Sequence, residues 1–159
     1  MEKNQETFRG KILKMKIIDN FLDKPDLEDL KNIVLGENFP WYMNDGVTWP
    51  GDGHIQFTHQ TFKNGEFKSS FTLGGLDIFK EKLGFTKILR AKFNLLQMTP
   101  EIVEHPYHTD LPDPGKNVKT AILYLNTNNG YTKFKTGEQV ESVENRLVLF
   151  DGNVQHAGT

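Results

Sequence analysis

Three residues of this sequence could together bind a metal ion: His108 and Asp110 in the segment EHPYHTD, and His156 in the segment LFDGNVQHAGT. Two imidazoles and one carboxylate can occupy one face of Fe(II) and leave the opposite positions open for a co-substrate and O2. His108 and Asp110 stand two residues apart, so in an extended segment both side chains point to the same face. If His156 converges on them, the residues favour an oxygenase.

Each of the three residues also has an ordinary structural interpretation. The chain contains five His, so one His-x-Asp pair carries a high risk of being accidental. His108 would then be a surface loop residue, and Asp110 would form a turn ahead of LPDPG. His156 would be a hairpin residue bonded to a neighbouring carbonyl. Convergence of the three side chains is what separates a metal site from these alternatives.

The composition excludes several classes of function. A chain of 159 residues suffices for one domain with a real core. Its net charge of -2 gives no electrostatic case for binding nucleic acid or an anionic membrane. The absence of cysteine excludes disulfides, thiolate metal sites and a cysteine nucleophile. We expect a soluble, cytoplasmic protein, because the N-terminus is polar and no apolar run is long enough to span a membrane.

Two short helices are expected in the first half of the chain. The first spans about residues 25–35, where Pro25 stands at the start, apolar residues recur on one face and Gly36 supplies the stop. The second spans about residues 75–83 and ends at Gly84.

Short strands separated by turn-forming residues make up most of the remaining sequence. They are expected at residues 12–18, 54–62, 86–98, 118–125, 131–135, 139–143, 146–150 and 154–157. The turn Asp151-Gly152-Asn153 predicts a hairpin between the last two strands. The pattern is typical of an α+β, mainly β protein whose β part is a sandwich or jelly roll.

From residue 90 onward the sequence resembles the Fe(II)- and 2-oxoglutarate-dependent oxygenases, in particular small prolyl-4-hydroxylase-like members from bacteria and phages. The matching segments are RAKFNLLQ, HPYHTD, KTAILYLNTNNGYTKF and ENRLVLFDGNVQHAGT. The resemblance implies a single domain over residues 1–159 with a double-stranded β-helix, a cupin-like jelly roll with a few N-terminal helices packed on one sheet. It also implies that His108, Asp110 and His156 hold Fe(II), while 2-oxoglutarate chelates the iron and O2 takes the remaining position.

The residues that would hold 2-oxoglutarate match the family less well. The family usually supplies an Arg or Lys about ten residues after the last His, whereas this sequence stops at Thr159, so we expect a further strand beyond it. Within the chain, Lys119 is the best substitute, although an ordinary solvent-facing lysine is the alternative. Asn94 matches an Asn of some relatives, and Tyr124 could supply a phenol or belong to the core.

The resemblance further implies hydroxylation of an unactivated C–H bond in a small molecule or a peptide, with peptidyl proline as the substrate suggested by analogy. His54, His59 and Trp49 would line the substrate mouth, although such residues more often have structural roles. Nucleic acid and membrane partners are not expected, and the sequence does not give the oligomeric state. Two rival functions remain: a non-catalytic cupin-like ligand-binding module, and a metal-dependent cupin enzyme that does not use 2-oxoglutarate.

Overall fold

Successive strands near the end of the chain belong in turn to two antiparallel sheets. The computed structural model describes residues 7–8, 11–12, 15–71, 75–111 and 117–159. The chain divides into two compact units, of which the first comprises Met1–Leu27 and Thr99–Thr159 and the second Glu28–Met98. The single domain over residues 1–159 stays a prediction, and each unit is described by itself.

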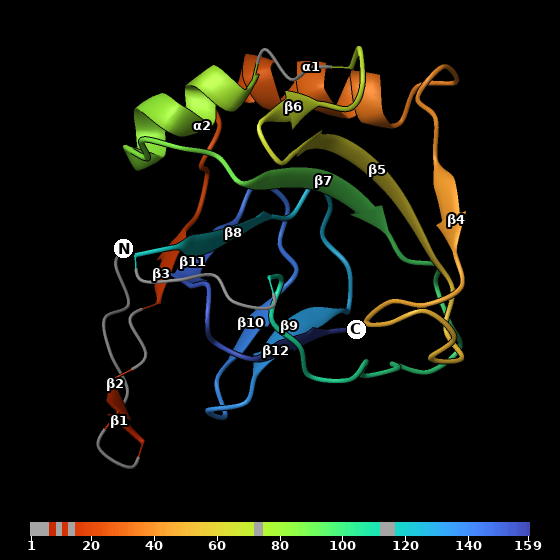
Figure 1. Ribbon diagram of the computed structural model, residues 1–159, viewed down its shortest axis with the longest axis vertical. Coiled ribbons are helices and arrows are strands. Elements are labelled where there is room, and N and C mark those ends of the chain that lie inside the picture. The colour runs from red at the N-terminus through yellow and green to blue at the C-terminus, as the bar shows by residue number, and fades with distance from the viewer. Residues whose placement is uncertain (1–6, 9–10, 13–14, 72–74, 112–116) are drawn as a thin grey trace. The chain divides into compact units, whose positions relative to one another are not determined.

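The first unit contains two sheets of three strands each (Figure 1). One has the order β3-β11-β8, formed by Lys16–Ile18, Leu147–Asp151 and Lys119–Leu123. The other has the order β10-β9-β12, formed by Gln139–Glu141, Tyr131–Phe134 and His156–Gly158. The short strands β1 (Thr7–Phe8) and β2 (Lys11–Ile12) pair with each other. The predicted strand at residues 12–18 is therefore realised at Lys16–Ile18, and residues 13–14 lie outside the described residues.

The core of the first unit lies between these two sheets. Phe134 and Val140 come from one sheet and Val148 and Phe150 from the other, and each is at most 1% exposed. Phe134 and Phe150 meet edge to face with ring centroids 4.9 Å apart, which is a favoured aromatic geometry. Alternation along β9 and β11 therefore fixes which of their side chains point inward, and His156 of β12, which lies opposite Phe134, shares this inward face.

The predicted hairpin at Asp151-Gly152-Asn153 is wrong. A turn does form there, since the N–H of Val154 donates to the carbonyl of Asp151 over 3.0 Å. However, β11 pairs with β3 on one edge and β8 on the other, so β12 has no free edge of β11 to join. The chain instead passes to the second sheet, where β12 pairs with β9.

The second unit is built around the long strand β5 (Gln56–Lys63). Its antiparallel partners are β4 (Tyr42–Asn44), β6 (Glu66–Phe67) and β7 (Arg90–Leu95). Asn64 and Gly65 both have positive φ, 56° and 84°, which is the backbone requirement of the tight turn that joins β5 to β6. β5 and β7 run side by side across most of the unit (Figure 1).

The two helices form where the sequence predicts them, at Lys24–Val34 (α1) and Gly75–Leu83 (α2). Gly84 ends α2 with φ +66°, a conformation that glycine adopts without steric cost. The described residues thus form a mainly β protein with antiparallel sheets and two helices, which confirms the predicted class. In the described part of the chain, neither helix has the length and apolar character needed to cross a membrane.

Candidate metal centre

His108 and His156 lie directly opposite each other in an antiparallel bridge. The N–H of His108 donates to the carbonyl of His156, and the N–H of His156 donates to the carbonyl of His108, each over 2.9 Å. Opposite residues in such a pair project their side chains to the same face. The two imidazole rings accordingly lie 4.8 Å apart between centroids.

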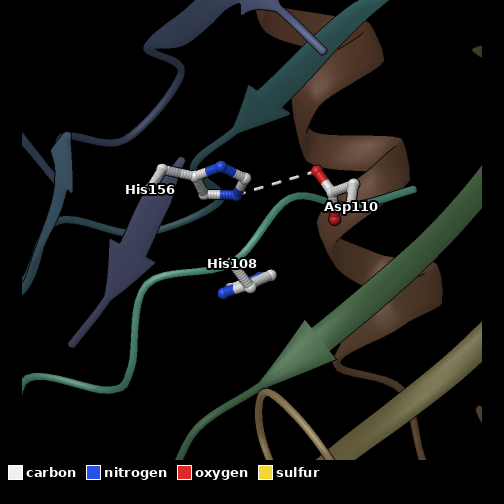
Figure 2. A group of neighbouring side chains, drawn as sticks. All are labelled: His108, Asp110 and His156. Carbon is white, nitrogen blue, oxygen red and sulfur yellow. Dashed lines mark ion pairs between the residues drawn. The ribbon is translucent and has the colours of Figure 1, made fainter. Parts of the chain in front are cut away.

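Asp110 completes the group from the same segment as His108. Its Oδ2 lies 3.7 Å from Nε2 of His156, and one ligand atom from each of the three residues lies within 4.8 Å of the others. Figure 2 shows the three side chains beside one another, with the dashed line joining Asp110 and His156. The Thr109 hydroxyl donates to the carbonyl of Leu111 over 2.9 Å, which braces the backbone on both sides of Asp110. The group could hold a metal ion.

Backbone carbonyls set the tautomer of both imidazoles. Nδ1 of His108 lies 3.2 Å from the carbonyl oxygen of Pro106, and Nδ1 of His156 lies 3.3 Å from that of Val154. A carbonyl oxygen can only accept, so each Nδ1 carries the proton and donates it. In the neutral ring Nε2 then keeps its lone pair, which is the tautomer that a metal-binding histidine needs.

The environment of the group is apolar beside His156 and more open beside the other two residues. His156 is 4% exposed and meets Phe150 edge to face, with centroids 4.9 Å apart. His108 and Asp110 are only partly buried. With neutral imidazoles the donor set carries one negative charge, so a divalent cation bound here would be partly neutralised.

The segment that carries His108 and Asp110 is attached to the edge of the second sheet. The N–H of His105 donates to the carbonyl of Gly158 over 3.0 Å, three residues before the His108–His156 bridge. Directly before His105, Glu104 accepts hydrogen bonds from Tyr131 and Lys133 of β9 at 2.6–2.9 Å. Backbone and side-chain contacts together hold both ligand-bearing segments in one position.

Tyr124 packs against the core between the two sheets. Its hydroxyl donates to Oγ1 of Thr132 over 2.7 Å. Thr132 and Phe134 alternate along β9 on the same face, opposite Gly158 and His156, so the Tyr124 hydroxyl is directed to the face that carries His156. Burial raises the pKa of the Tyr124 phenol above its ordinary value, and the phenol therefore stays protonated at neutral pH.

Lys119 forms an ion pair with Asp151, the residue directly opposite it in the pairing of β8 with β11. Both side chains are nearly half exposed. Because side chains alternate along a strand, Lys119 lies on the face of β8 opposite to Ile122, which packs on the core. The ammonium thus has a local structural role, and its expected contact with 2-oxoglutarate stays a prediction.

The remaining candidates belong to the second unit. Asn94 lies in β7 opposite Thr58 of β5. Trp49 and His54 flank a loop organised by Asp52, whose carboxylate accepts backbone N–H groups and has a lowered pKa for that reason. His59 is 2% exposed, with both ring nitrogens within 2.6 Å of an oxygen. The predicted roles of these residues at the co-substrate and the substrate mouth stay predictions.

Sequence reasoning missed the residues that prepare the two imidazoles. Pro106 and Val154 each stand two residues before a ligand His and offer only a backbone carbonyl, so their side chains give no signal. Their only sign in the sequence is that each stands the same distance, two residues, before a ligand histidine.

Comparisons of the chain with family models, with curated proteins and with solved structures found no match. A functional assignment therefore depends on the chemistry of the site itself.

Proposed function

We propose that this protein is a non-haem Fe(II)- and 2-oxoglutarate-dependent dioxygenase that hydroxylates an unactivated C–H bond. The observation that carries the proposal is the convergence of His108, Asp110 and His156, with ligand atoms within 4.8 Å of one another. Two imidazoles and one carboxylate with open positions are the donor set typical of non-haem Fe(II) oxygenases.

The donor atoms fit a divalent iron ion. Neighbouring donors of one metal ion lie about 3 Å apart, because each metal–ligand bond is about 2.1 Å long. Small side-chain rotations would bring the His156 and Asp110 atoms, now 3.7 Å apart, to that separation. In their neutral forms both imidazoles keep Nε2 unprotonated, which leaves a lone pair for a metal ion.

The strand order supports a double-stranded β-helix. β8 belongs to one sheet of the first unit, β9 and β10 to the other, β11 to the first again and β12 to the second. Such alternation between two facing sheets is typical of a jelly roll. The same alternation explains how the site forms, because it places β12 in the second sheet, where His156 lies opposite His108.

When bound, Fe(II) would supply the activation of O2, which is coupled to decarboxylation of 2-oxoglutarate to succinate and CO2. The residues of this chain position the reactants. His108, Asp110 and His156 would bind the iron, and the protonated Tyr124 hydroxyl can donate to a co-substrate carboxylate in place of Thr132. Phe150 and Phe134 exclude water behind His156. The proposed substrate is a small molecule or a peptide, with peptidyl proline suggested by the family resemblance.

Calorimetry with Mn(II) as a redox-inert substitute tests the proposal. We expect 2-oxoglutarate to bind the Mn(II)-loaded protein at least about tenfold more tightly than succinate, which lacks the chelating keto oxygen. Asp110→Asn should lose this binding, whereas Asp151→Asn, which changes a surface carboxylate, should keep it. Equal or absent binding of the two acids to the loaded protein would contradict the proposal and favour a metal-dependent cupin enzyme. Absence of metal binding would favour a non-catalytic module.

A further inference from the structure

A serine and a buried histidine of the second unit are hydrogen-bonded, and neither is a residue of the metal centre. Nδ1 of His59 lies 2.6 Å from the carbonyl oxygen of Pro40, and Nε2 lies 2.6 Å from Oγ of Ser69. The carbonyl can only accept, so Nδ1 carries the ring proton. In the neutral ring Nε2 is then an acceptor, and the Ser69 hydroxyl donates to it.

This direction of the hydrogen bonds is the one required of a serine whose proton is taken by a general base. The carbonyl of Pro40 holds the imidazole in the position and tautomer that a carboxylate provides in other such arrangements. The N–H of Phe71 donates to the same Ser69 oxygen over 3.1 Å. These two hydrogen bonds leave one lone pair of the hydroxyl unused.

A β-bulge lies beside the arrangement. The pairing of β5 with β7 shifts register between Gln60 and Phe62, one residue after His59. The carbonyl of Thr61, the extra residue, accepts the N–H of Lys68 over 2.8 Å and so holds the chain that leads to Ser69. Bulges recur beside active sites, where they redirect side chains.

Aromatic packing fixes the His59 ring. Phe39 stacks on it with centroids 4.4 Å apart and an interplanar angle of 30°, and Phe71 meets it edge-on at 5.8 Å. The ring is 2% exposed, so it has little freedom to leave the Ser69 hydroxyl.

A pocket opens beside this pair. Its volume is about 260 Å³, and His59 and Ser69 line it together with Tyr42, Lys68, Ser70 and Phe71. The volume lies just below the usual range for ligand sites of about 300–1,000 Å³, so only a small molecule would fit.

We propose that Ser69 is a nucleophile, activated by His59, that reacts with small carboxylic esters. Ser69 Oγ would attack the ester carbonyl carbon while its proton moves to Nε2 of His59. The bond from that carbon to the alcohol oxygen breaks, and the alcohol leaves with the proton. Water then attacks the acyl-Ser69 ester, His59 takes a proton from that water, and Ser69 regains it as the carboxylic acid departs.

Acylation by p-nitrophenyl acetate tests this proposal in the full chain. Peptide mapping by mass spectrometry should find the acetyl group on Ser69, and Ser69→Ala should lower release of p-nitrophenolate at least about 100-fold. Thr99→Ala, which removes an exposed hydroxyl that does not line this pocket, should leave the rate unchanged. Equal labelling of Ser69 and Ser70, or an unchanged rate in a folded Ser69→Ala, would overturn the proposal.

A second measurement uses the absence of cysteine from the natural chain. Ser69→Cys and Ser70→Cys would each contain a single thiol, and iodoacetamide reacts with the thiolate form. We expect Ser69→Cys to be alkylated at least about tenfold faster at neutral pH, because His59 accepts its proton, although Ser69 is the less exposed of the two. Faster reaction of Ser70→Cys would contradict the proposed activation.

Discussion

Asp110 supplies the one negative charge among the three proposed ligands, and its carboxylate lies 3.7 Å from His156 Nε2. Replacing Asp110 by Asn keeps the shape of the side chain but removes its charge and replaces a carboxylate oxygen by an amide oxygen, which is a weaker metal ligand. Loss of a residue that only hydrogen-bonds a metal ligand already lowers metal affinity about 10–100-fold. We therefore expect Asp110→Asn to weaken Mn(II) binding by at least about 100-fold in calorimetry.

The matched control for this substitution is Asp151→Asn, since Asp151 pairs with Lys119 at the surface. It should bind Mn(II) like the wild type. A similar loss in both variants would mean that general electrostatic attraction, not coordination, holds the cation.

Glu104 contributes a pH-dependent contact to the segment that leads to the metal centre. Hydrogen bonds from Lys133 and then Tyr131 lower the pKa of its carboxyl below the ordinary value of 4.5. The ionised Glu104 carboxylate therefore stabilises the folded state fully above about pH 4.5, and this stabilisation is lost as the pH falls through the lowered pKa. The urea midpoints of the wild type and Glu104→Gln should differ at neutral pH and converge in acid. A difference that does not shrink below pH 4.5 would contradict this.

Among the elements, the turn before β11 depends on one buried side chain. Asn145 accepts the N–H of Leu22 over 2.9 Å and donates to its carbonyl over 2.8 Å, while its own φ is +62°. Asn145→Ala would remove these hydrogen bonds from the backbone N–H and carbonyl of Leu22, which is buried. We expect a loss of about 2–4 kcal/mol in the free energy of unfolding, measured by urea denaturation.

Asn117→Ala separates this effect from backbone strain, because Asn117 also has a positive φ, +67°, but is exposed. It should cost only about 1 kcal/mol. Equal losses at the two positions would show that strain accounts for the effect and that the Leu22 contacts contribute little.

Local pattern was sufficient to predict both helices and the longer strands, but it missed the short strands β4 and β6 and did not give the partners of the strands. Pro25, Gly36 and Gly84 locate both helices because helix ends are governed by local backbone chemistry. The pairing of β12 with β9 rather than β11 depends on which strand edges are already occupied, and no local residue records that. The turn at Gly152 therefore suggested the wrong partner.

The same distinction applies to the candidate site. The shared face of His108 and Asp110 follows from their spacing, whereas the bridge from His108 to His156 depends on the long-range path of the chain. The contact of Ser69 with His59 could not be predicted for a similar reason, since it depends on how the chain returns beside β5 after β6.

For the whole molecule, metal binding should appear as added stability. The folded chain alone brings the three ligands together, so an ion that binds them stabilises the folded state by mass action. Mn(II) at 100 times its dissociation constant should add about 2.7 kcal/mol, or about 5–10 °C in Tm for a chain of this size. Calorimetric scans with and without Mn(II) measure this, and the same shift in Asp110→Asn would contradict binding at the proposed site.

An anaerobic titration with Fe(II), followed by 2-oxoglutarate, tests the central proposal most directly. We predict a visible charge-transfer band in the wild type once both are present, because chelation places the keto oxygen on the iron. His108→Ala, which removes one ligand, should show no band, whereas His54→Ala should retain it. A wild type that binds Fe(II) yet shows no band with 2-oxoglutarate would contradict the proposed dioxygenase.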